Sequence, residues 1–161
     1  MRKFILITLV VVVLVACQEK KELCYTGFTF STGNIKMCYS LKFNSSDTVY
    51  YQNEYGPAKK KALYYFLLKK NEKKMVDSII CSFQFPKDSV LLNDKINDGT
   101  TIAFSMDDKR LMLHGNEGPE SFWNFEDGMN RFLKYKQIHV TNCKIKFADF
   151  STMIPRVKVE K

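Results

Sequence analysis

Apolar residues at helical spacing occur in two stretches of this chain, and this limits the number of amphipathic helices that it can form. In both stretches they recur every three or four residues, at Met75, Val76, Ile79, Ile80 and Phe83, then at Phe122, Phe125, Met129, Phe132 and Leu133. Such a repeat places one apolar face on each helix. Asn71 can cap the first helix, and Pro86 ends it at or before Phe85. Gly118-Pro119-Glu120 starts the second.

The remaining apolar segments are short and rich in aromatic or β-branched residues, which is typical of strands. They are residues 23–30, 35–43, 48–51, 62–68, 101–105, 110–114 and 138–147, with a short last strand at 157–159. Turn residues at 31–34 and 44–47 predict an antiparallel meander of the first three, and Asp107-Asp108 predicts a hairpin. Residues 62–68 could also be read as a helix.

The expected order is three strands, a fourth strand, a helix, a hairpin, a second helix and a closing strand. This order predicts an α+β fold, an antiparallel sheet with two amphipathic helices. With 161 residues, 45% of them hydrophobic, and few Gly and Pro, the chain is neither collagen-like nor wholly disordered. We expect a single domain over 23–161, long enough to bury one core.

The N-terminal sixteen residues have the pattern of an export signal. Met1-Arg2-Lys3 is basic, and the uncharged run from Phe4 to Ala16 follows it. As a helix this run would be about 20 Å long, too short for a bilayer core of about 30 Å. We therefore interpret residues 1–16 as a signal peptide, whose removal lowers the formal charge from +8 to +6.

Leu14-Val15-Ala16-Cys17 resembles the lipobox of bacterial lipoproteins. The resemblance implies that Cys17 receives a diacylglyceryl group, that the chain is cut before it, and that the new amine is acylated. Two or three acyl chains anchor a protein stably. Residues 17–22 would be the lipidated Cys and a charged tether, which resembles the surface-export tags of Bacteroidota lipoproteins. We expect an outer-membrane location, facing the periplasm or the cell surface.

A second resemblance covers residues 24–135. Cys38-Tyr39-Ser40-Leu41-Lys42-Phe43 and Ser46-Asp47-Thr48-Val49-Tyr50-Tyr51 resemble the opening strands of a family of uncharacterised exported α+β domains of Bacteroidota. That family's Pro and second Cys are missing here, and Asp47 is not followed by Gly. The resemblance implies a fold and no active site.

The four cysteines after Cys17 are an even number in a chain expected in an oxidising compartment, where disulfides form. Cys24 and Cys38 flank a predicted hairpin, so we expect them to pair, which leaves Cys81 with Cys143. Buried thiols are the alternative. Cys81 would lie on the wet face of its helix, so either it is paired or the helix ends by about Ile80. The cysteine spacing does not match a zinc site, and we expect no metal and no cofactor.

The sequence lacks common nucleophile, phosphate-binding and metalloprotease motifs. His114, at the end of a predicted strand, could act as a base with Glu117 or Asp107. A solvent-facing role at the strand end is the simpler interpretation, and His139 is expected on a wet strand face. We therefore predict no catalytic residue.

Lysines form a candidate binding patch, at Lys59, Lys60, Lys61, Lys69 and Lys70. They could meet anionic headgroups or another envelope component. Arginine is scarce after residue 16, which argues against nucleic acid as a partner. The sequence thus predicts a non-enzymatic lipoprotein that acts as a binding or structural module, held to the bilayer through acylated Cys17, with an unknown envelope protein or glycan as partner. The alternatives are an envelope inhibitor or immunity protein, or a small hydrolase that uses His114.

Overall fold

The computed structural model describes residues 23–54 and 62–153. Its strands and helices, in chain order, are β1 Phe28–Gly33, β2 Cys38–Phe43, β3 Thr48–Asn53, β4 Leu63–Leu67, α2 Lys70–Ser82, β5 Val90–Leu92, β6 Thr101–Met106, β7 Lys109–His114, α3 Glu120–Leu133 and β8 His139–Val140, followed by a 3₁₀ turn at Ser151–Met153. The signal peptide, the lipobox, the tether, Lys59–Lys61 and the strand expected at 157–159 lie outside the described residues.

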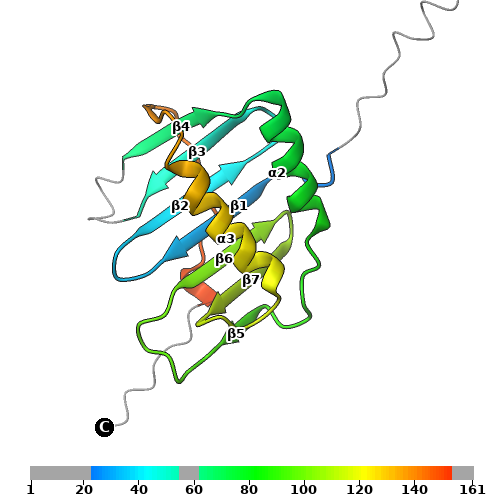
Figure 1. The fold of residues 1–161 in the computed structure, drawn as a ribbon, viewed down its shortest axis with the longest axis vertical. Coiled ribbons are helices and arrows are strands. Elements are labelled where there is room, and N and C mark those ends of the chain that lie inside the picture. Colours follow the sequence, from blue (N-terminus) through cyan, green and yellow to red (C-terminus); the bar gives the residue numbers. More distant parts are fainter. Residues whose placement is uncertain (1–22, 55–61, 154–161) are drawn as a thin grey trace, which may run out of the picture.

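In the described part of the chain, eight strands form one sheet in the order β5-β7-β6-β1-β2-β3-β4-β8. The neighbours pair antiparallel, except that β5 runs parallel to β7. Both helices lie on one face of this sheet (Figure 1). The predicted α+β class with two amphipathic helices is confirmed, as are the meander of β1 to β3 and the hairpin of β6 and β7.

The core lies between the sheet and the helices and is built mainly of phenylalanine. Its fully buried rings are Phe28, Phe30, Phe43, Phe66, Phe104 and Phe122. Phe83, just beyond α2, stacks on Phe122 of α3 with 4.4 Å between ring centroids. Both helices thus meet the sheet through the apolar faces that their sequence periodicity predicts.

Three segments differ from the prediction. β1 begins at Phe28 and continues to Gly33, because Ser31 to Gly33 pair with β2 and β6 on both sides instead of turning. β5 was not predicted, since three residues are too few to show a period. The strand expected over 138–147 is reduced to His139–Val140.

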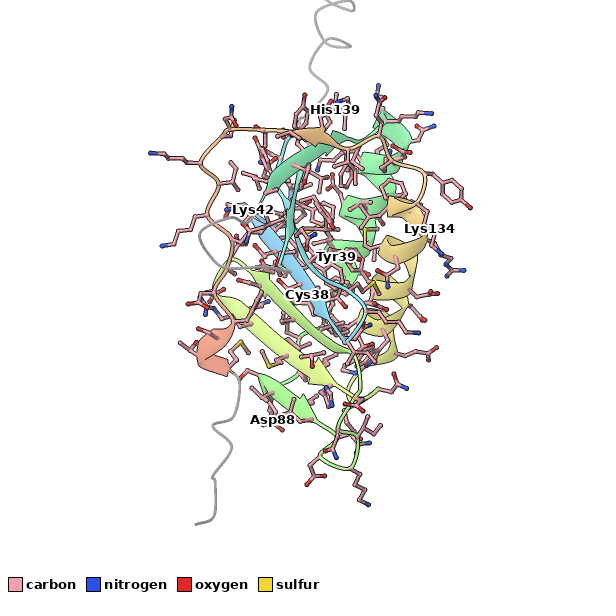
Figure 2. The ribbon with its side chains drawn as sticks, turned by 90° about the vertical axis from the view of Figure 1, so that its left-hand side faces the viewer. Cys38, Tyr39, Lys42, Asp88, Lys134 and His139 are labelled. Atoms are coloured by element: carbon pink, nitrogen blue, oxygen red, sulfur yellow. A yellow bond between two sulfur atoms is a disulfide. The ribbon has the colours of Figure 1, made fainter. Side chains whose placement is uncertain are left out.

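After β8 the chain crosses the face of the sheet that the helices leave uncovered. We call residues 141–153 the crossing segment. Lys42 of β2 donates from Nζ to the Lys146 carbonyl at 2.7 Å, and Arg110 of β7 donates to the Asp149 carbonyl at 3.1 Å. Figure 2 shows the sheet between the helices on one side and this segment on the other. These side-chain contacts replace the strand ladder that the alternation predicted.

Candidate functional site

A row of paired residues crosses the uncovered face near one end of the sheet. Cys38 pairs with Gly33, Gly33 with Thr101, and Thr101 with His114, across β2, β1, β6 and β7. The next residues along β1 and β2 point the other way, since Thr32 bonds to Glu126 and Tyr39 to Asn130 of α3. Because side chains alternate along a strand, this row faces away from the helices.

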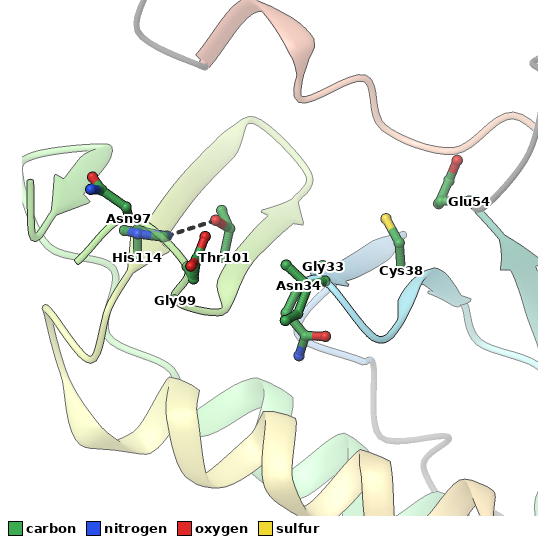
Figure 3. A pocket seen from close by; sticks show the side chains of 10 residues that line it. Gly33, Asn34, Cys38, Glu54, Asn97, Gly99, Thr101 and His114 are labelled. Carbon is green, nitrogen blue, oxygen red and sulfur yellow. Dashed lines mark hydrogen bonds between the residues drawn. The ribbon is translucent and has the colours of Figure 1, made fainter.

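A hollow of about 530 Å³ opens over this row. We call it the row pocket; its lining residues are Gly33, Asn34, Ile35, Cys38, Glu54, Asn97, Asp98, Gly99, Thr101 and His114 (Figure 3). Gly33 forms its floor, and a Cβ added there would lie 3.2 Å from the Cys38 Sγ. The absence of one side chain in the middle of the row therefore keeps the pocket open.

Both ring nitrogens of His114 are hydrogen-bonded. Nε2 lies 2.6 Å from the Ile96 carbonyl oxygen, which can only accept, so Nε2 carries a proton. Nδ1 lies 2.8 Å from the Thr101 hydroxyl, and the Asn34 side-chain amide donates to the hydroxyl of the neighbouring Thr100 at 3.3 Å. In the neutral ring Nδ1 accepts from the Thr101 hydroxyl, so each of the two hydrogen bonds of the ring has one donor and one acceptor.

The structure also tests whether His114 pairs with Asp107 or Glu117 as a general base. Asp107 lies at the opposite end of the β6–β7 hairpin from His114, and its carboxylate binds Thr26. Glu117 approaches His114 through its backbone amide, at 3.4 Å from the His114 carbonyl. The pairing of His114 with either acid is wrong. His114 is half-buried and faces the row pocket instead of bulk solvent.

Cys38 and His114 line the same pocket but do not form a nucleophile–base pair. Three strand spacings of about 4.8 Å separate their Cα atoms by roughly 14 Å. A thiolate–imidazole pair needs hydrogen-bond contact, about 3 Å between heavy atoms. The pocket therefore offers polar groups for binding, without that catalytic arrangement.

Glu54 closes the far end of the row. Its backbone amide donates to the Cys38 carbonyl at 2.9 Å. Its Oε1 accepts from the Ser40 hydroxyl and from the Gln52 amide, both at 2.9 Å, and Ser40 lies 2.7 Å from the Ser31 hydroxyl. With Asp98 also in the lining and neither lysine nor arginine among the lining residues, the pocket is acidic in a basic protein. This charge disfavours anionic ligands.

A disulfide joins Cys24 to Cys81, with 5.7 Å between their Cα atoms. The predicted pairs Cys24–Cys38 and Cys81–Cys143 are therefore wrong, while the expectation that Cys81 on a continuous helix is paired is confirmed. Cys24 precedes β1 beside α2, whereas Cys38 faces the uncovered side of the sheet. Cys38 and Cys143 remain as thiols, Cys143 on the exposed crossing segment. Sequence spacing alone could not separate the pairings, because they depend on which side of the sheet each cysteine lies.

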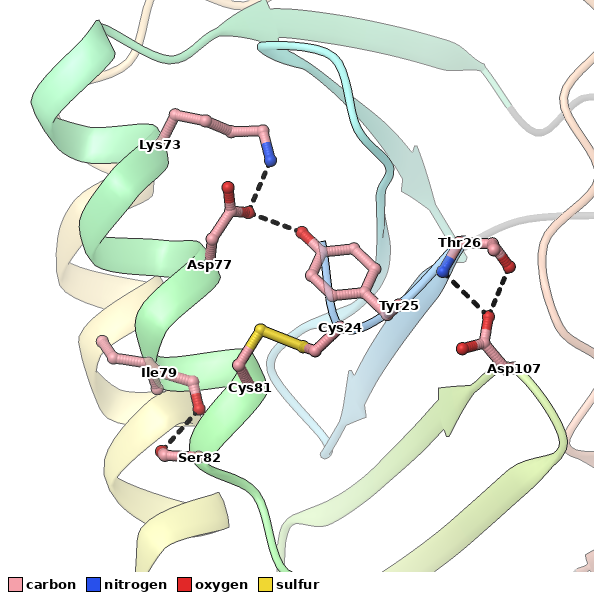
Figure 4. Close-up of a disulfide and its surroundings, with 9 residues drawn as sticks. All are labelled: Cys24, Tyr25, Thr26, Lys73, Asp77, Ile79, Cys81, Ser82 and Asp107. Carbon is pink, nitrogen blue, oxygen red and sulfur yellow. Dashed lines mark hydrogen bonds and ion pairs between the residues drawn. A yellow bond between two sulfur atoms is a disulfide. The ribbon is translucent and has the colours of Figure 1, made fainter. Parts of the chain in front are cut away.

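Polar contacts reinforce the same junction (Figure 4). The Tyr25 hydroxyl donates to Asp77 of α2 at 2.7 Å, and Lys73 forms an ion pair with the same carboxylate. Burial raises the pKa of the Tyr25 hydroxyl far above its ordinary value, so it stays a donor. Covalent and hydrogen bonds together fasten the start of the domain to α2.

A second group of hydrogen bonds fixes the residues just before β1. Asp107 Oδ1 accepts from the Thr26 hydroxyl and from the backbone amides of Thr26 and Gly27. The hydrogen bond from the Thr26 hydroxyl, with help from the two amides, holds the pKa of the Asp107 carboxyl below its ordinary value. The sequence predicted Asp107 in a turn, and its left-handed φ of 53° fits that turn, but the contacts with Thr26 and Gly27 were not predicted.

Of the predicted lysine patch, Lys69 and Lys70 lie exposed at the start of α2, and Lys59–Lys61 lie outside the described residues. Glu72 accepts from the Lys69 backbone amide at 2.6 Å and binds Lys136 at 2.6 Å. The structure thus places Lys69 and Lys70 on the helix layer, far from the row pocket across the sheet.

No family model matches the chain, and searches of curated proteins and of solved structures also give no match. Among residues 23–54 and 62–153, no group of His, Cys, Asp and Glu has the arrangement of a metal site. No helix in the same residues is long and apolar enough to cross a membrane.

Proposed function

We propose that this protein is a lipid-anchored, non-enzymatic binding module of a bacterial envelope, held by acylated Cys17 and presenting the row pocket to its ligand. The observation that carries the proposal is the Cys24–Cys81 disulfide, which lies seven residues after the lipobox cysteine. Disulfides persist mainly in exported proteins. Two independent features, the lipobox and the disulfide, thus favour the same compartment.

The disulfide of Cys24 and the hydrogen bond of Tyr25 also suit an anchored protein. Any pull on the tether reaches the domain at the Cys24–Cys81 bond and the adjacent Tyr25–Asp77 hydrogen bond. These contacts pass the load to α2, whose Val76 and Ile80 are fully buried in the core. A pull on the tether would therefore be carried by α2 and the core before it reaches β1.

The row pocket supports binding as its role. Glu54, Thr101 and His114 are each held by hydrogen bonds, so the pocket presents fixed polar groups. Its carboxylates and lack of cationic lining favour an uncharged polyhydroxyl ligand, such as a glycan, or a ligand that bears an amine. The bonded state of both His114 nitrogens supports a non-catalytic role for this ring.

Metabolic labelling with a fatty acid tests the anchor. The wild type should incorporate label, Cys17→Ser should not, and Cys143→Ser should label like the wild type because its thiol lies on the folded domain. Equal label on the wild type and Cys17→Ser would reject the lipoprotein.

A substrate screen tests the non-enzymatic part. The purified protein is assayed against generic esterase, peptidase, glycosidase and phosphatase substrates, and we expect no turnover. Turnover that His114→Ala lowers on the order of 100-fold would instead support the hydrolase.

A further inference from the structure

The outer face of α2 carries positive charge that no acid of the helix offsets. Lys70, Lys74 and Ser78 are exposed at four-residue intervals, so they form one stripe along the helix. The stripe ends beside Cys81, where the disulfide holds the incoming chain. Lys69 adds a further exposed cation at its start.

Of the two acids of α2, Glu72 is turned away from this stripe and Asp77 lies beside it, but both carboxylates are already bound. Glu72 is engaged by Lys136 and by the Lys69 amide, and Asp77 by Lys73 and the Tyr25 hydroxyl. Their charges are compensated within the fold. The lysines of the stripe therefore present a surface that attracts anions.

The position of the anchor decides which anions this surface can meet. Six residues separate Cys17 from Cys24, and seven extended steps reach at most about 25 Å. The 13 residues of α2 span about 20 Å from that point. An acylated Cys17 would thus hold the whole stripe within reach of the lipid surface.

Two further features of α2 fit a lipid surface. Met75, next to Lys74, is 52% exposed although it is apolar. A hollow of about 730 Å³ lies between α2 and the incoming chain, and Lys74 and Ser78 line it. Asp77 also lines it, with its carboxylate paired to Lys73, and so does Ser82, whose hydroxyl donates to the Ile79 carbonyl. An ammonium and hydroxyls are the groups that bind a phosphate oxygen.

We propose that the exposed stripe of α2, Lys70, Lys74 and Ser78 with Lys69, rests on the anionic headgroups of the membrane that holds Cys17. This rests on the proposed lipid anchor. The helices and the row pocket lie on opposite sides of the sheet, so this orientation turns the pocket away from the membrane and toward the compartment that supplies its ligand.

Acetylation footprinting of the intact lipoprotein tests the orientation. The protein is placed in vesicles of phosphatidylcholine, with or without phosphatidylglycerol, and treated briefly with an amine-acetylating reagent. Attraction of about 1 kcal/mol per lysine predicts about fivefold slower acetylation of Lys70 and Lys74 in the anionic vesicles. Lys95 and Lys144, both exposed on other surfaces, should react equally in the two. High salt should remove the protection.

Charge reversal supplies the matched variants. Lys70→Glu/Lys74→Glu should abolish the protection of Lys69, whereas Lys95→Glu/Lys144→Glu should leave it unchanged. Equal acetylation of Lys70 and Lys74 in both vesicles, on protein whose Cys17 carries lipid, overturns the orientation and leaves the anchor intact. A Cys17 peptide without lipid mass would instead remove the proposed function, and the orientation with it.

Discussion

Removing the Cys24–Cys81 disulfide should cost this domain a large part of its stability. The bond joins residues 57 positions apart, and in the chain-entropy model closing such a loop stabilises the fold by about 4 kcal/mol at 25 °C. For a domain of this length that loss lowers the melting temperature by about 15 °C. The bond also holds Tyr25 near Asp77, so the loss should not fall far below this figure.

The measurement is urea unfolding followed by circular dichroism, with Cys24→Ser/Cys81→Ser compared with the wild type. Cys143→Ser should unfold like the wild type, because Cys143 is an exposed thiol. Reductant should lower the free energy of unfolding of the wild type to that of the double variant and leave the double variant unaffected. A loss below about 1 kcal/mol would refute the argument that this bond closes the 57-residue loop.

Three further predictions follow from single contacts. Gly33→Val places a side chain against the Cys38 Sγ, so in a Cys143→Ser background it should slow the reaction of Cys38 with a maleimide several-fold. The control Gly27→Ala, where a Cβ meets nothing within 4 Å, should not slow this reaction. Equal rates in the background protein and both variants would show that Gly33 is not the pocket floor. Phe122→Ala should cost about 3–5 kcal/mol in urea unfolding, because this ring of α3 is fully buried against Phe83 and Phe104; a loss under 1 kcal/mol would contradict this packing. The pKa of the Asp107 carboxyl is lowered in the folded protein, so its contribution to stability is complete above the unfolded pKa of about 4 and is lost as pH falls through the folded pKa. The difference in free energy of unfolding between the wild type and Asp107→Asn should therefore shrink as pH falls below about 4. A difference that stays constant with pH would contradict this prediction.

Periodicity carried the fold prediction where segments were long enough to show it. The apolar faces that pack α2 and α3 on the sheet, and the alternation in β2, were readable because burial on one face imposes a period. β5 and the crossing segment were not readable. Three residues show no period, and residues 141–153 are held by backbone carbonyls that accept from Lys42 and Arg110, an interaction that leaves no pattern in the segment itself.

The row pocket could not be predicted from the sequence for a different reason. Its residues come from four strands and adjoining loops, and they meet only through the register that pairs Cys38, Gly33, Thr101 and His114. His114 was singled out for its position at the end of a predicted strand, but its partners, Thr101 and the Ile96 carbonyl, depend on that register. The disulfide depends likewise on which side of the sheet Cys24 and Cys81 occupy.

The intact mass of the protein isolated from its native envelope tests the central claim most directly. The account predicts a chain that begins at Cys17, carries a diacylglyceryl group with a further acyl chain, and weighs two hydrogens less than the fully reduced form because Cys24 and Cys81 are joined. An unlipidated chain, or one in which Cys24 and Cys81 both react with a thiol reagent before reduction, would contradict it.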